Sequence, residues 1–82
     1  MVSETDNPAV ELQAVLAADK GGEARRRLSD ALASIRADVR RQQNVGVSPS
    51  EFRVLESIDG AAEAAGTVVE AVWRRYHGDA SI

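Results

Sequence analysis

The chain has 82 residues, a formal net charge of −3 and no cysteine. This length allows one small domain at most, and a hydrophobic core of that size stabilises a fold only weakly. The lack of cysteine excludes disulfides and thiolate metal sites. The acidic balance argues against nucleic acid, which usually requires a basic surface. No apolar run approaches the roughly 18 residues that a membrane-spanning helix needs.

The composition favours helices. The chain holds one Phe, one Tyr and one Trp, so its core must be built from Leu, Ile, Val and Ala. Three segments show apolar residues at the spacing of amphipathic helices, and none alternates as a strand does. The sequence therefore predicts an all-α fold in a single domain over residues 1–82.

The first predicted helix covers residues 8–18. Asn7 suits the N-cap and Pro8 the first helical position. Its apolar stripe is formed by Leu12, Val15 and Leu16. The sequence DKGG at residues 19–22 then interrupts the helix, because paired glycines end or loosen helices.

The second predicted helix covers residues 23–43. Its apolar residues follow steps of four, three and four: Leu28, Leu32, Ile35 and Val39. Such a heptad seam is typical of a helix that packs lengthwise on another helix. The opposite face carries several arginines.

The third predicted helix covers residues 49–77. Ser48 suits the N-cap, Pro49 the first position, and Glu51 completes a capping box. Apolar residues then repeat at alternating steps of three and four: Leu55, Ile58, Ala62, Ala65, Val69, Val72 and Tyr76. A second stripe follows a seven-residue step: Val54, Ala61 and Val68. Gly78 is placed to end the helix.

The short connection at residues 44–47 predicts that the two long helices form an antiparallel, coiled-coil-like hairpin, with the short helix in front of it. In that arrangement Arg36 lies near Glu56 or Asp59. Exposed ion pairs of this kind set register more than they stabilise.

The end of the third helix extends beyond most of the second helix, and two things could cover it. The residues in question are Val69, Val72, Trp73 and Tyr76. The first helix could fold back over them and complete a three-helix bundle. Alternatively, a partner protein could cover them. The partner is favoured, because a two-helix core is marginal, a hairpin cannot bury two stripes, and Trp and Tyr are frequent anchors of protein interfaces.

The sequence offers no catalytic constellation. His77 is the only histidine, and nothing in the sequence places a nucleophile or carboxylate beside it. The carboxylates of the third helix form a solvated face, since metal-binding bundles usually add His within the core. We therefore expect no enzyme activity, no metal and no cofactor. The N-terminus is acidic, with no basic or apolar signal region, so the expected location is cytoplasmic.

A capped helix that opens with SPSEF and continues through VLESIDGAAEAAGTVVEAVWRRYHG, after the basic helix RRRLSDALASIRADVRRQ, resembles a known family. These are the small co-chaperones of type III secretion needle subunits, of the EscE/YscE/SsaE type. The similarity extends over roughly residues 10–78 and is strongest from Trp73 to His77. The first helix departs most from the family pattern.

The resemblance implies a cytoplasmic helical hairpin that pairs with a tetratricopeptide-like chaperone. Together the two proteins would hold the needle subunit monomeric before export. The implied partner-binding residues are Val69, Val72, Trp73 and Tyr76, supported by Leu28, Leu32 and Ile35. Two alternatives stay open: a polymerising needle or inner-rod subunit, and a small regulator that dimerises into a helical bundle.

Overall fold

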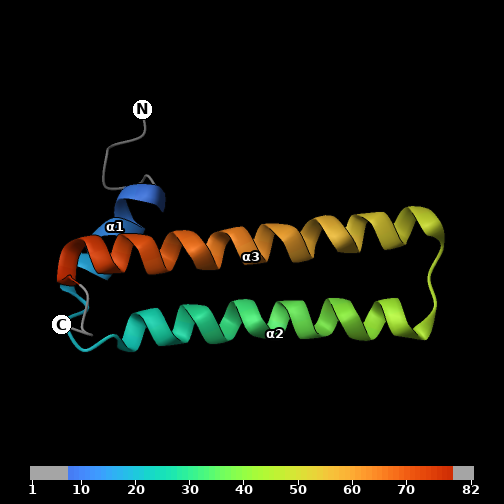
Figure 1. Ribbon diagram of the computed structural model, residues 1–82, viewed down its shortest axis with the longest axis horizontal. Coiled ribbons are helices and arrows are strands. Elements are labelled where there is room, and N and C mark those ends of the chain that lie inside the picture. Colours follow the sequence, from blue (N-terminus) through green and yellow to red (C-terminus); the bar gives the residue numbers. More distant parts are fainter. Residues whose placement is uncertain (1–7, 79–82) are drawn as a thin grey trace.

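The computed structural model describes residues 8–78. They form three helices, α1 (Pro8–Ala18), α2 (Glu23–Val45) and α3 (Pro49–His77). The helices α2 and α3 lie side by side and antiparallel, and α1 lies across one end of the pair (Figure 1). The predicted all-α hairpin with a short N-terminal helix is confirmed. The helix α2 ends at Val45 instead of residue 43, and the expected N-cap Asn7 lies outside the described residues.

The bounds of α3 follow from local chemistry. The Ser48 side chain accepts a hydrogen bond from the Glu51 N–H at 3.2 Å, which satisfies one of the free N–H groups at the helix start. Pro49 fits the first position because its missing N–H has no partner to lose there. At the other end, Gly78 adopts a φ of 74°, and its N–H donates to the Arg74 carbonyl at 2.7 Å. None of the described helices is long and apolar enough to cross a membrane.

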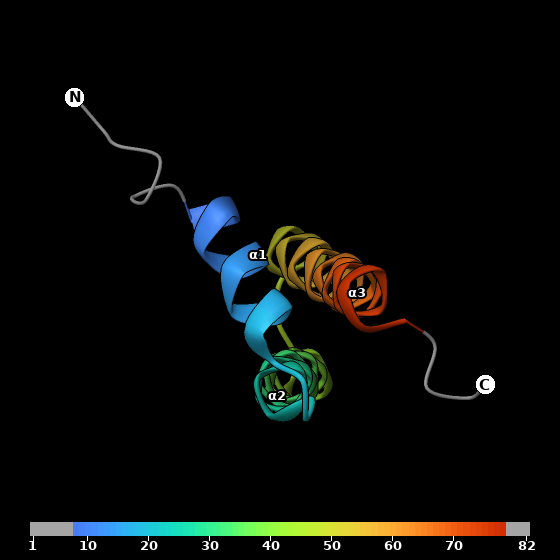
Figure 2. The ribbon, with the colours of Figure 1, turned by 90° about the vertical axis from the view of Figure 1, so that its left-hand side faces the viewer.

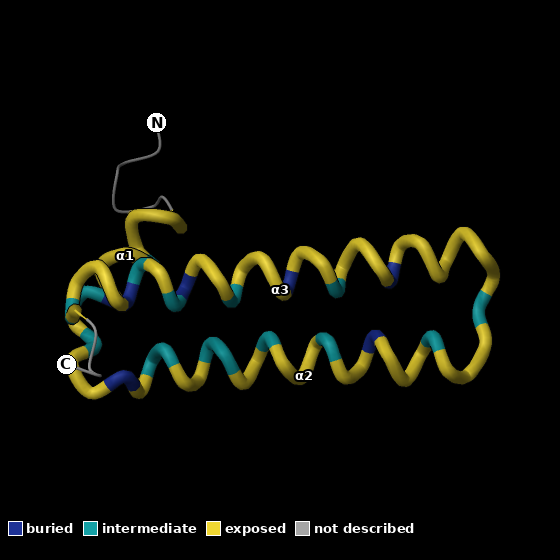
Figure 3. Tube along the Cα trace, in the orientation of Figure 1, coloured by how far each residue is buried: buried dark blue, intermediate teal, exposed yellow. Residues whose placement is uncertain are grey.

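The buried and half-buried positions of α2 and α3 lie mostly on the sides of the two helices that face each other (Figure 3). Val39 on α2 is 4% exposed, and Leu55, Ala62 and Val69 on α3 are 9% exposed or less. The steps of seven between the three α3 residues are those of the predicted seam. The hairpin interface therefore follows the heptad spacing that the sequence shows.

The other half of the predicted seam is wrong by one residue. Ile58 is 41% exposed and Ala65 is also exposed, whereas Asp59 and Gly66 take the inward positions. A Cβ atom added at Gly66 would lie 3.8 Å from the Leu32 side chain, so the glycine leaves room for that leucine. Asp59 reaches Arg36 on the facing helix. The contact of Leu32 with Gly66 and the ion pair of Arg36 with Asp59 thus take the inward positions, and the two apolar residues beside them lie at the surface.

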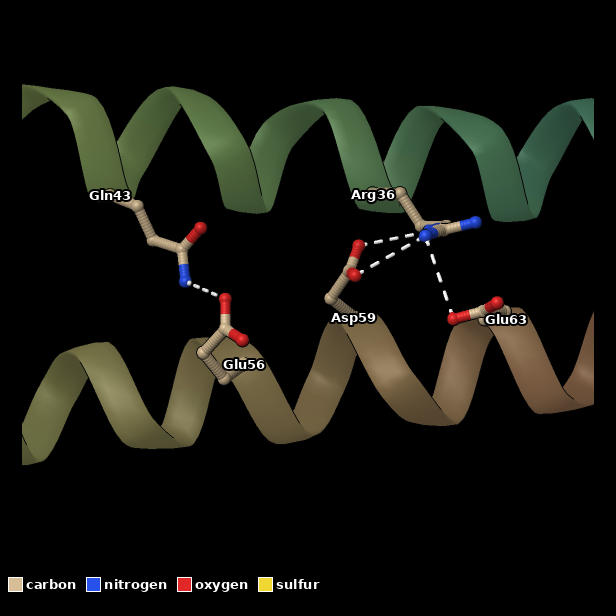
Figure 4. A network of polar contacts seen from close by, with 5 residues as sticks. All are labelled: Arg36, Gln43, Glu56, Asp59 and Glu63. Atoms are coloured by element: carbon tan, nitrogen blue, oxygen red, sulfur yellow. Dashed lines mark hydrogen bonds and ion pairs between the residues drawn. The ribbon is translucent and has the colours of Figure 1, made fainter.

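Polar contacts bridge one flank of the hairpin (Figure 4). The Arg36 guanidinium donates to both Asp59 oxygens, at 2.9 and 3.3 Å, and lies 3.8 Å from Glu63. The hydrogen bond from Arg36 holds the pKa of Asp59 below its ordinary value, with burial acting in the opposite direction. Gln43 donates to Glu56 at 2.8 Å. The expected pairing of Arg36 with Asp59 is therefore confirmed, and it marks the register of the two helices.

Two glycines should respond in opposite directions to replacement by alanine. Gly66→Ala adds only an ordinary contact inside a helix, so we expect a gain of about 0.5–1 kcal/mol in the free energy of unfolding. Gly22 has a φ of 77°, which strains any side chain, so Gly22→Ala should lose about 1–2 kcal/mol. Urea denaturation followed by circular dichroism measures both. A stabilised Gly22→Ala variant would contradict the positive φ of Gly22 in the turn between α1 and α2.

Candidate partner-binding face

The helix α1 packs on one flank of the hairpin, against both of the long helices (Figure 2). Its Leu16 is fully buried and forms a cluster with Val69 and Trp73 of α3. Around this cluster lie three partly buried side chains: Leu12, Leu28 and Val72. The short helix thus supplies the third wall of a core that the hairpin alone would leave open.

Trp73 connects the end of α3 to the elbow between α1 and α2. Its indole Nε1 donates a hydrogen bond to the Asp19 backbone carbonyl at 2.9 Å. The Arg25 guanidinium lies 4.1 Å from the centre of the indole ring, in cation–π geometry, and also pairs with Glu70 at 3.7 Å. Gly22 is buried beneath the ring, where an added Cβ would lie 3.7 Å from the indole.

His77 makes a second contact of the same kind. Its Nε2 lies 2.6 Å from the Leu16 carbonyl oxygen. A carbonyl oxygen only accepts, so Nε2 must carry the proton in this contact. The last carbonyls of a helix have no partner within the helix, and α1 has no basic side chain in its last turn to meet them. The Leu16 and Asp19 carbonyls also accept from the N–H groups of Asp19 and Gly22, each at 3.2 Å, so His77 and Trp73 add a second hydrogen bond to each carbonyl at the C-terminal end of α1.

Asp19 caps the start of α2, although it lies three residues before the N-cap position. Gly22 holds that position and has no side chain, and the Asp19 carboxylate accepts from the N–H groups of Ala24 and Arg25 at 3.0 and 2.9 Å. Burial alone would raise the pKa of Asp19. The hydrogen bonds from the backbone of residues 23–25 and from Trp73 outweigh burial and lower the pKa below 3.8.

This cap predicts an acid-dependent loss of stability. The folded-state pKa of Asp19 is depressed, so its carboxylate stabilises the fold above the unfolded-state pKa and loses this effect as pH falls through the folded-state value. Asp19→Ala should lower the melting temperature at pH 7, and its difference from the natural chain should shrink below about pH 3.8. Asp30→Ala, an exposed change on α2, is the control. Equal effects of the two variants at pH 7 would contradict the capping role.

The structure corrects the preference for a partner protein as the cover of the α3 end. The helix α1 covers Val69 and Trp73, which are 4% and 7% exposed. The reason is the elbow, since Gly22 permits the turn and Asp19 with Trp73 and His77 fixes it. Leu28 and Val72 are half-buried beside α1.

The other predicted site residues keep accessible surface. Leu32 is half-buried on α2, and Ile35 is 43% exposed. Tyr76 is 49% exposed and lies with Gln13 of α1 at the edge of the covered region. The predicted set is therefore divided: α1 occupies part of it, and the remainder faces solvent.

A continuous row of exposed apolar residues runs along α3 from the turn toward α1. It comprises Val54, Ile58, Ala61, Ala65 and Val68, with the valines 60% and 53% exposed. The steps of four, three, four and three lead on to Val72, which packs beside the α1 cluster, so the row and α1 share one flank of the hairpin.

The second long helix contributes to the same flank. Ala31 and Ile35 follow Ala24 and Leu28 at heptad steps, and the latter two line a hollow together with α1. We call the surface formed by Ala31 and Ile35 of α2 together with the exposed row on α3 the apolar flank.

The helical repeat places Glu56 and Glu63 on the opposite side of α3 from the exposed row. These two carboxylates contact Gln43 and Arg36 of α2 (Figure 4). The hairpin thus has one charged flank and one apolar flank.

Sequence reasoning found part of this face. The sequence predicts that Val54, Ala61 and Val68 form a second stripe that one hairpin leaves uncovered, and the structure confirms that they are exposed. The heptad spacing wrongly predicts that Ile58 and Ala65 lie in the interior. The residue that follows each of them gives the signal that corrects this prediction. Asp59 follows Ile58 and lies opposite an arginine, and Gly66 follows Ala65 and lies opposite a leucine.

Residues 11–76 match the model of a family described as the type III secretion system, cytoplasmic E component of needle. The chain belongs to this family. The match covers nearly all of the three helices, including the elbow and the apolar flank. No curated protein and no solved structure matches the chain. The resemblance inferred from the two long helices is confirmed, and the E-component match also includes most of α1.

Single substitutions at the end of α3 should separate internal from accessible positions. Trp73→Ala removes a buried ring and its hydrogen bond, so we expect this E component to lose about 3–5 kcal/mol of stability. Tyr76→Ala changes a half-exposed side chain and should cost less than about 1 kcal/mol. Thermal and urea unfolding of the isolated chain measure both. An isolated Trp73→Ala variant as stable as the natural chain would show that α1 does not depend on the indole.

Proposed function

We propose that this needle E component is a co-chaperone that pairs with a tetratricopeptide-like chaperone in the cytoplasm. The pair keeps the needle subunit monomeric before export. The observation that supports this role most directly is the apolar flank, which stays open from Val54 to Val68 while the opposite flank is charged. Soluble proteins rarely leave a continuous apolar surface without a binding function.

The chemistry of the flank suits a helical partner. Its residues repeat at helical spacing and are themselves uncharged, so covering them costs no ion hydration, and the charged side chains of Glu11, Arg27 and Glu51 stand at its ends. Tetratricopeptide-like proteins are built from helix pairs, whose exposed apolar faces match such a surface. A needle subunit polymerises, so its own apolar helix must be covered until export. We assign the E component a binding role with no catalytic step.

Within this proposal, the predicted residues fall into two groups. Ile35 of the apolar flank and Tyr76 at the far edge of α1 form the first group and contact the chaperone directly. Leu32 packs toward Gly66 inside the hairpin and supports the flank from there, so it belongs to the second group. Val69, Val72, Trp73 and Leu28 act through α1, because they hold it in place at the end of the flank. The first group should affect binding with little change in stability, and the second group should affect both.

The test uses the chain produced together with the tetratricopeptide-like chaperone and the needle subunit of the same secretion system. Val68→Glu places a charge on the apolar flank and should weaken chaperone binding at least tenfold, or about 1.4 kcal/mol. Thr67→Glu is the matched control, since this neighbouring exposed residue points away from the flank. Isothermal titration calorimetry gives the affinities, and circular dichroism checks the fold.

Unchanged affinity of Val68→Glu would contradict the proposal. Size-exclusion chromatography of the chain alone separates the other candidate roles. Assembly that grows without limit as concentration rises would indicate a needle or inner-rod subunit. A stable homodimer that does not bind the chaperone would indicate a small helical-bundle regulator.

A further inference from the structure

Two hollows mark the ends of the apolar flank. One, of about 280 Å³, lies next to the turn of the hairpin and is lined by Gln42, Val47, Val54 and Leu55, among others. The other, of about 390 Å³, lies in the corner between α1 and α2 and is lined by Leu12, Val15, Ala24 and Leu28, among others. An apolar cavity of about 150 Å³ already holds a benzene-sized group, so each hollow has room for a large apolar side chain.

Both hollows open on the same flank. Val54 begins the exposed row on α3, and the hollow at the turn adjoins it. Ala24 and Leu28 line the corner hollow and lead along α2 to Ala31 and Ile35. Between the hollows the surface of α3 is formed by Ala61 and Ala65, whose small side chains let another helix approach closely. The two hollows and the surface between them form one continuous track.

The length of the track follows from α2. Leu28 lines one hollow and Gln42 the other, and they lie fourteen residues apart (42 − 28) on the same helix. At a rise of 1.5 Å per residue this separation is about 21 Å, or close to four helical turns. Fourteen residues are also two heptads, so both positions fall on the same side of the helix.

The helix α1 shows what this flank accepts. It is a helix that presents leucines four residues apart, Leu12 and Leu16, to Val69, Val72 and Leu28 of the hairpin. It leaves half of the Val15 surface exposed toward the corner hollow. The open part of the flank continues this intramolecular interface, with residues of the same type and spacing.

We propose that the partner contacts the apolar flank through a single amphipathic helix of at least four turns, which lies lengthwise between α1 and the turn. This helix carries two bulky apolar side chains about fourteen residues apart, one for each hollow. The inference rests on the proposed function and specifies the surface that the chaperone must present. The helix α1 acts as the stop that fixes the register of the partner helix along the hairpin.

Filling each hollow tests this arrangement. Gln42→Trp fills the hollow at the turn, and Val15→Trp fills the corner hollow, both from exposed positions. Arg40→Trp and Ala14→Trp are the matched controls on exposed positions of the same helices, outside the hollows. With the purified tetratricopeptide-like chaperone as the probe, each filling variant should raise Kd at least tenfold, and each control less than threefold.

The outcomes distinguish the inference from the proposed function. If both filling variants bind as the natural chain does while Val68→Glu does not, the flank binds the chaperone but the two-anchor arrangement is wrong. If Val68→Glu also binds normally, the proposed function fails as well.

A cross-linking experiment covers variants that fold poorly. Photoreactive benzoylphenylalanine at positions 42 and 15 should capture chaperone residues about fourteen apart on one helix, as identified by mass spectrometry. Capture on two different helices, or no capture at either position in a complex that still forms, would overturn the inference.

Discussion

The length of α1 relative to the hairpin is the constraint on which the surface of this protein depends. The helix has 11 residues, whereas α3 has 29. These lengths correspond to about 16 and 43 Å. Because α1 also crosses the hairpin and does not run along it, it can cover only one end of the apolar flank (Figures 1 and 2). The remainder stays in contact with solvent, while the opposite side of the hairpin carries the charged network.

The aromatic and imidazole groups at the end of α3 explain why α1 stays in place. A short helix with few apolar contacts is weakly held by burial alone. Trp73 and His77 add hydrogen bonds to carbonyls at the end of α1, and Asp19 ties the same elbow to the start of α2. Three chain segments thus meet at one point, where the Leu16 and Asp19 carbonyls each accept a second hydrogen bond beside the one from their own backbone turn. This junction turns a two-helix hairpin into a defined core with an adjacent open surface.

Much of the fold could be predicted from local signals. Ser48 with Pro49 and Gly78 fixed the bounds of α3, and heptad spacing identified the inward residues Leu55, Ala62 and Val69. The intermediate inward positions could not be read in this way, because hydrophobicity favours Ile58 and Ala65 over an aspartate and a glycine. Their burial depends on which residues stand opposite on α2, a tertiary property. The position of α1 could not be predicted from the sequence pattern either. It depends on hydrogen bonds from Trp73 and His77 to carbonyls that lie far away in the chain.

The most direct test of the account is methyl NMR of the valines with a soluble paramagnetic agent, in the free chain and in the complex with the tetratricopeptide-like chaperone. In the free chain, Val54 and Val68 should be strongly relaxed by the agent, while the buried Val39 and Val69 should not. We predict that the complex protects Val54 and Val68 and leaves the other two unchanged. If both exposed valines remain as accessible in the complex as in the free chain, the apolar flank is not the binding surface.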